Sequence, residues 1–188
     1  MTLDPRSPVI IGAGQHLHRA EGIDDSLDAI ALMERAVLAA TADAGLDGPP
    51  TPDALRVVSL LSWRYGNPPR FLAEQLGIDP ARLEYTAMGG NTPQSLVNRT
   101  ALEIQAGALD IAILTGGEAR RTRMRAKKTG TLLPWPKAAA DDRPTIIGTE
   151  LEMNLDAETL RGINLPVQIY PMFETALRAA SGRTPEEH

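Results

Sequence analysis

Short apolar runs alternate along the chain with segments whose apolar residues recur at helical spacing. Four runs have the length and β-branched content of buried strands: residues 8–12, 55–61, 83–88 and 111–115. Helical spacing marks the three segments between them: residues 25–45, 69–76 and 91–107. Strands that alternate with helices in this way predict an α/β fold, with a mostly parallel βαβαβαβ sheet and helices on both faces.

The ends of these helices have the residue types that helix termini favour. Asp25 or Ser26 can cap the first helix, and Gly45 is a natural stop for it. Asn91 can cap the third helix, with Pro93 in its first turn. The chain therefore carries local boundary signals that agree with its hydrophobic periodicity.

Ligands of open α/β sheets bind beyond the carboxyl ends of the strands, so the segments there are candidate sites. Gly12-Ala13-Gly14 follows the first predicted strand as a dinucleotide-binding turn would, but Leu17 stands where the third glycine of that pattern belongs. The pattern thus favours a tight turn over a nucleotide site.

The predicted strand-to-helix junction at residues 86–95 is a second candidate, because a helix N-terminus stabilises negative charge. Gly89 lies at this junction, and Thr92 and Ser95 lie just inside the helix. Either hydroxyl needs a neighbouring base to act as a nucleophile, and His16 and His18 are the histidines available for that role. The alternative for Thr92 is a helix cap.

Composition excludes several classes of function. The 188 residues carry a formal net charge of −5 and no cysteine, which excludes disulfide scaffolds, cysteine-ligated metals and a cysteine nucleophile. Three histidines make a multi-histidine metal site improbable, and the acidic balance disfavours nucleic-acid binding. No apolar run has membrane-span length and no signal peptide is recognisable, so we expect a cytoplasmic protein.

Positive charge is concentrated in one short segment. Six cations fall within nine residues: Arg120, Arg121, Arg123, Arg125, Lys127 and Lys128. Such a cluster can bind the phosphates of a small polyphosphate ligand, and the alternative is a solvated loop. Prolines break the chain that follows into short pieces, so we expect a core domain at residues 1–118 and an excursion from the sheet at 119–188.

Several segments, in order and spacing, resemble the N-terminal half of the thiolase superfamily of acyl-CoA acyltransferases. These segments read DAGLD, LAEQLGID, YTAMGGNTPQSLVN and EIQAGALDIAILTGGEA. More narrowly, the GGNTPQ stretch resembles actinobacterial thiolase-like proteins described as acetyl-CoA acetyltransferases. The resemblance implies a thiolase-like half-fold with a truncated loop subdomain at 119–188.

The resemblance also implies where function lies. Thiolases carry a nucleophilic cysteine at the strand-to-helix junction, and Gly89 occupies that position here. In the family the loop region contacts the nucleotide end of coenzyme A, which implies a CoA-binding set of Arg121, Arg123, Arg125, Lys127 and Lys128. Coenzyme A is then a substrate or ligand, and no other cofactor or metal is expected.

Three hypotheses for function follow from the resemblance. The first is an acyltransferase-type protein of lipid metabolism that binds acyl-CoA thioesters, with the isolated chain inactive. The second is a non-catalytic CoA-binding or interaction protein. The third is a carbon–carbon lyase acting on acyl-CoA side chains. The expected partners are acyl-CoA and a second thiolase half that these residues do not contain, with a homo-oligomer also possible.

Overall fold

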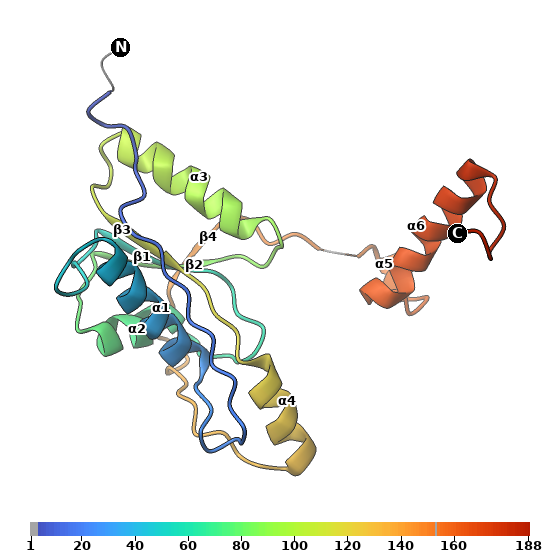
Figure 1. Cartoon of the computed structure of the whole chain (residues 1–188), viewed down its shortest axis with the longest axis horizontal. Coiled ribbons are helices and arrows are strands. Elements are labelled where there is room, and N and C mark those ends of the chain that lie inside the picture. Colours follow the sequence, from blue (N-terminus) through green and yellow to red (C-terminus); the bar gives the residue numbers. More distant parts are fainter. Residues whose placement is uncertain (1–3, 153) are drawn as a thin grey trace. The chain divides into compact units, whose positions relative to one another are not determined.

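The computed structural model describes residues 4–152 and 154–188, which fall into two compact units, Met1–Glu150 and Leu151–His188 (Figure 1). The first unit contains a sheet of four parallel strands in the order β3-β1-β2-β4. The strands are β1 (Ala54–Val57), β2 (Arg82–Thr86), β3 (Ala112–Thr115) and β4 (Thr145–Ile147). This arrangement confirms the predicted α/β class and its parallel sheet.

Helices cover both faces of the sheet, as the sequence predicts. Side chains of β1 alternate between the faces, and Leu55 and Val57 join the core formed with α1 (Ala29–Asp43) and α2 (Pro68–Leu76). Arg56 points to the opposite face, where it bonds to residues of α3 (Thr92–Gln105). The core is therefore apolar on one face of β1 and ionic on the other.

The helix caps follow the predicted chemistry only in part, because Asn91 lies at the N-cap of α3 but its side chain makes no capping hydrogen bond. Asp28, rather than Asp25 or Ser26, caps α1 by accepting a hydrogen bond from the Ala31 amide at 2.8 Å. Asp25 instead closes the preceding turn, where its carboxylate accepts from the amides of residues 21 and 22. These hydrogen bonds lower the pKa of Asp25.

The strand predicted at residues 8–12 is wrong. This segment has no strand geometry, and within the described residues its backbone forms no hydrogen bond. The segment packs closely against α1 instead, and β3 takes the place beside β1. At Gly12 the approach is so close that an added Cβ would lie 2.2 Å from the carbonyl oxygen of Ala40.

Within residues 119–188, which the sequence predicts as an excursion from the sheet, the chain returns to the sheet once. Residues Arg120–Thr129 form helix α4, and β4 returns to the sheet and pairs with β2. The first compact unit therefore extends to Glu150, and the boundary expected between residues 118 and 119 stays a prediction.

The second unit is helical. It contains α5 (Asp156–Thr159) and α6 (Pro166–Ser181), and none of their residues is buried. Tyr170 and Phe173 make an edge-to-face aromatic contact with ring centroids 5.9 Å apart, and both remain more than half exposed. Among the described residues no helix is long and apolar enough to cross a membrane.

Candidate functional site

The carboxyl ends of the parallel strands form one edge of the sheet, and hydrogen bonds hold the loops there together. The Ser59 amide donates to the Thr86 hydroxyl at 2.9 Å, and the Leu60 amide donates to the Tyr85 hydroxyl at 2.6 Å. The loop that follows β1 is thus fixed to the end of β2.

Glu118 fixes the same loop to the end of β3. Its carboxylate accepts hydrogen bonds from the amides of Leu61 and Ser62 at 2.5 and 2.8 Å, and the Ser62 hydroxyl accepts one from the Ala119 amide at 3.2 Å. Sequence reasoning did not assign this role to Glu118. The signal available was a carboxylate directly after a glycine pair at a strand end, where it can reach backbone amides of a neighbouring loop.

Gly89 lies in the loop between β2 and α3, at the same edge of the sheet. The Thr92 hydroxyl donates to the Gly89 carbonyl at 2.8 Å, so this hydroxyl closes the turn before α3. Within the described residues no hydrogen bond joins His16 or His18 to Thr92 or Ser95, and the nucleophile–base pairs considered from sequence are not formed. His18 instead lies 2.8 Å from the carbonyl oxygen of Asp25.

The space around Gly89 can accept a side chain. An added Cβ would lie 2.9 Å from the Asn91 Oδ1 atom and 3.2 Å from the Thr92 Cγ2 atom. The first neighbour is the end of a side chain that makes no capping hydrogen bond, and the Gly89 backbone is not left-handed. The junction can therefore accommodate a side chain at position 89 if the Asn91 side chain moves, but glycine provides no reactive group there.

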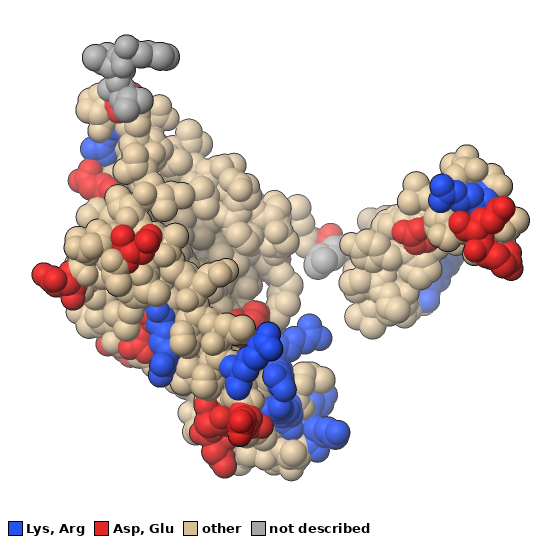
Figure 2. All heavy atoms as spheres, in the orientation of Figure 1, with Lys and Arg blue, Asp and Glu red and all other residues tan. Residues whose placement is uncertain are grey.

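The cationic cluster of residues 120–128 lies on helix α4. This helix follows the loop after β3, so it begins at the same edge of the sheet. Figure 2 shows Lys and Arg side chains gathered over this part of the first unit. The helix has no acidic residue in its first turn, and Lys127 and Lys128 lie in its last turn, where cations are favourable.

The five residues predicted to bind CoA divide into two groups. Arg123 donates to the carbonyls of Leu61 and Ser62, and Arg125 donates to the carbonyls of residues 20 and 21. Arg121, Lys127 and Lys128 are exposed and, within the described chain, make no side-chain hydrogen bond or ion pair. Arg123 and Arg125 thus hold α4 in place, while the other three face solvent.

A small cavity of about 70 Å³ lies beside the N-terminus of α4. Its lining is mostly polar and includes His18, Glu118, Arg121, Thr122 and Arg125. In the part of the chain that the structure describes, no group of three or more His, Cys, Asp or Glu residues has metal-binding proximity. The lining thus combines two cationic side chains, Arg121 and Arg125, with the carboxylate of Glu118.

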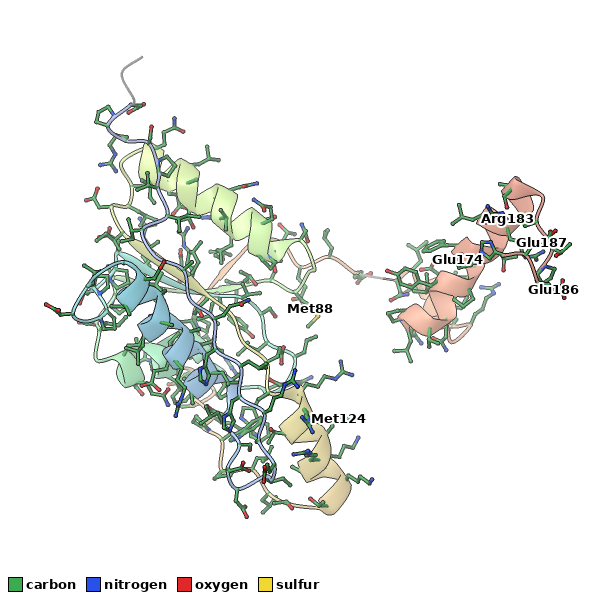
Figure 3. All side chains as sticks on the ribbon, viewed as in Figure 1. Met88, Met124, Glu174, Arg183, Glu186 and Glu187 are labelled. Carbon is green, nitrogen blue, oxygen red and sulfur yellow. The ribbon has the colours of Figure 1, made fainter. Side chains whose placement is uncertain are left out.

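Apolar side chains accompany the cations at this edge. Met88 in the loop after β2 and Met124 on α4 are 46% and 55% exposed, and Figure 3 shows both at the end of the sheet from which these loops emerge. Flexible thioether side chains adapt to apolar groups of varied shape. The edge thus offers both charge and apolar surface.

The anchoring role of Arg123 and Arg125 predicts a structural effect of their loss. Changing both to alanine should release α4 from the loops at residues 20–21 and 61–62, because four hydrogen bonds to backbone carbonyls disappear. Amide hydrogen exchange in α4 should rise, while exchange in β1 stays as in the parent. The matched double change of Lys127 and Lys128 to alanine removes equal charge and should leave exchange in α4 unchanged; equal rises in both variants would contradict the anchoring role.

Comparison with known proteins places the fold. No protein-family model matches the chain, and no curated protein sequence matches it. Among solved structures, the chain is similar to a monomeric SCP2-thiolase-like protein type 1 from Mycobacterium smegmatis, with 30% sequence identity and a TM-score of 0.53. The match covers 61% of this chain and 24% of the Mycobacterium chain. The fold is thiolase-like. The chain spans about a quarter of the length of the Mycobacterium protein.

The comparison confirms the predicted resemblance at the level of the thiolase-like fold. The narrower resemblance to acetyl-CoA acetyltransferases stays a prediction. Gly89 lies in a strand–loop–helix junction of this thiolase-like fold, at the end of β2 and just before α3.

Proposed function

We propose that this chain binds acyl-CoA thioesters without forming a covalent intermediate. The observation that supports the proposal is the position of the solvent-facing cations Arg121, Lys127 and Lys128 on a helix that begins at the same edge of the sheet as the junction at Gly89. Coenzyme A combines an anionic nucleotide end with a neutral pantetheine arm and an apolar acyl group, so it requires cations and apolar surface together.

The residues fit the parts of such a ligand as follows. Arg121, Lys127 and Lys128 would attract the phosphates, with Arg121 able to form two parallel hydrogen bonds to one phosphate. Met88 and Met124 would contact apolar parts of the ligand. Because Gly89 offers no thiol, the thioester would remain intact, which favours the binding hypothesis over acyl transfer by the chain alone.

The binding test compares two variants that lose equal charge. Arg121→Ala with Lys128→Ala should reduce CoA affinity about tenfold, or roughly 1.4 kcal/mol, in calorimetric titration. Arg35→Ala with Arg99→Ala removes two exposed arginines from α1 and α3 and should bind CoA as the parent does. Binding of pantetheine, which lacks the phosphates, should be the same in all three proteins.

Salt provides the second arm of this test. The affinity of the parent for CoA should fall with ionic strength, because the Debye length shortens from about 10 Å at 0.1 M to about 3 Å at 1 M. Equal CoA affinity in the two double variants, or no CoA binding by the parent, would overturn the proposal.

A further inference from the structure

The outward face of helix α4 places positive charge around one apolar side chain. Ala126 is the buried residue of this helix, and Arg123 and Arg125 bond to the two neighbouring loops. Met124 lies two positions from Ala126, on the opposite side of the helix, and is 55% exposed. Four exposed cations stand three or four positions from Met124, the spacing of neighbours on a helix surface: Arg120, Arg121, Lys127 and Lys128. They therefore surround Met124, and Figure 2 shows Lys and Arg side chains projecting from this part of the first unit.

These four cations have no partner of opposite charge among residues 4–152 and 154–188. Their side chains form no ion pair or hydrogen bond there, and α4 itself contains no acidic residue. The acidic loop of residues 21–25 meets α4 at Arg125, which donates to the carbonyls of residues 20 and 21. Helical spacing puts Arg120 and Lys127 on the far side of Met124 from Arg125. Positive charge on that side is therefore the least compensated.

A second apolar side chain protrudes beside the end of this helix. Gly130 ends α4 in the left-handed conformation at φ 69°, and the Thr131 amide donates to the Ala126 carbonyl at 3.0 Å. This hydrogen bond fixes the start of the following loop to the helix. Leu132 comes next and is 92% exposed, the highest value among the large apolar side chains that the structure describes. The surface at α4 thus combines unpaired cations with protruding apolar groups.

This combination favours an anionic lipid surface over other anionic partners. Nucleic acid phosphates are bound through charged and polar groups, so protruding methionine and leucine add nothing to such contacts. Interfaces between folded proteins disfavour lysine, and two lysines lie on this face. A bilayer is fluid, so a helix that extends away from the sheet, as α4 does in Figure 1, can insert apolar side chains between headgroups. The long stems of Lys and Arg then let their charges reach the lipid phosphates.

We propose that α4 docks the chain onto anionic phospholipid membranes. The four cations bind lipid phosphates, while Met124 and Leu132 enter the boundary between headgroups and acyl chains. The chain carries a net charge of −5, so the rest of its surface is repelled by such a membrane. At physiological salt that repulsion is screened beyond about 8 Å, whereas cations in contact with headgroups are screened much less. The inference goes beyond the proposed CoA binding, because Arg120 and Leu132 have no part in that proposal.

The first test measures sedimentation of the chain with lipid vesicles. The parent should bind vesicles of phosphatidylcholine and phosphatidylglycerol, and should not bind vesicles of phosphatidylcholine alone. Arg120→Ala with Lys127→Ala should weaken binding about twentyfold, since each cation near an anionic membrane contributes about fivefold. Arg35→Ala with Arg99→Ala removes equal charge from α1 and α3 and should bind as the parent does. No binding by the parent, or equal losses in the two double variants, would overturn the proposal.

The second test asks whether Leu132 enters the lipid. The chain contains no cysteine, so Leu132→Cys and Leu102→Cys each provide one site for an environment-sensitive dye. Both leucines are exposed, at 92% and 65%, but Leu102 lies on α3. On anionic vesicles the dye at position 132 should emit at shorter wavelength, and the dye at position 102 should not change. An unchanged spectrum at position 132, or equal shifts at both positions, would contradict docking through α4.

A third variant separates membrane docking from CoA binding. Leu132→Ser should weaken vesicle binding about tenfold, because less apolar surface leaves water, and its CoA affinity should equal that of the parent. Leu102→Ser should change neither. Vesicle binding by a parent that does not bind CoA would support docking and overturn only the proposed function. Tighter binding of the parent to polyglutamate or duplex DNA than to anionic vesicles would contradict the proposal, because lipid would then not be the preferred partner.

Discussion

Arg56→Met is expected to lower the free energy of unfolding by about 3–5 kcal/mol, the usual cost of removing one partner from a buried ion pair. The Arg56 side chain is fully buried. It donates to Glu84 at 2.5 Å, to the Thr100 hydroxyl at 2.6 Å and to Glu103. Methionine keeps much of the volume but leaves the Glu84 carboxylate, which is 7% exposed, without its cation.

A matched control separates burial from charge. Arg99 pairs with the same Glu103 at 2.8 Å, but its side chain is 52% exposed. Arg99→Ala should therefore cost no more than about 1 kcal/mol. Urea unfolding of both variants and the parent gives these free energies directly. Similar losses of unfolding free energy in Arg56→Met and Arg99→Ala would show that burial does not determine how much each arginine stabilises the protein.

The ion pairs that Glu103 forms with Arg56 and Arg99 predict that the stability of the protein depends on pH. Burial raises the pKa of Glu103, but hydrogen bonds from Arg56 and Arg99 outweigh burial, and the net pKa is lowered. A carboxyl whose pKa is lower in the folded state stabilises above its unfolded pKa, about 4.3 for glutamate, and loses that contribution as the pH falls. Stability of the parent should decline across this acidic range more steeply than that of Arg56→Met. Parallel pH profiles would contradict this assignment.

Gly89→Cys is expected to turn an inert junction into a reactive one. The parent has no cysteine and should form no thiol adduct with iodoacetamide and no thioester with acetyl-CoA. The variant should fold, because the nearest obstacle to a Cβ is the Asn91 side chain. Mass spectrometry should show one iodoacetamide adduct per chain in the variant and none in the parent.

The reactivity of the new thiol measures the electrostatics of the junction. The N-terminus of α3 should lower its pKa by about one unit, since a helix N-terminus stabilises a thiolate. A lower pKa also weakens the nucleophile, so the alkylation rate at neutral pH should exceed that of Leu17→Cys only about threefold. Alkylation rates measured over a range of pH give both the pKa of the thiol and its rate at neutral pH. An unshifted pKa would show that the helix dipole does not reach position 89.

Most of the sheet and its helices could be predicted because their signals are local. Asn67 caps α2, and Gly77 ends it in the left-handed conformation at φ 66°, as expected from a glycine after a helix. Residues 8–12 show the limit of such signals. Their composition predicts a strand, but pairing depends on which neighbour β1 takes, and β1 takes β3. Strand β4 was missed because it has only three residues.

The sequence predicts which cationic residues belong to the candidate site, but not which of them face solvent. Sequence identifies the cations of residues 120–128, and only the three-dimensional contacts show that Arg123 and Arg125 bond to backbone carbonyls. Arg56 was missed for a similar reason. It lies within an apolar run, where nothing local indicates that its acidic partners stand 28 and 47 positions further along the chain.

Those sequence separations have a consequence for how the protein assembles. A guanidinium cannot leave water favourably until its carboxylate partners are in place, so Arg56 requires β2 and α3 to arrive together. Contacts between residues far apart in sequence also form slowly, because long loops must close first. The pairing of β1 with β2 and the docking of α3 should therefore form a single cooperative step, and an intermediate with the sheet complete and α3 detached should not accumulate during refolding.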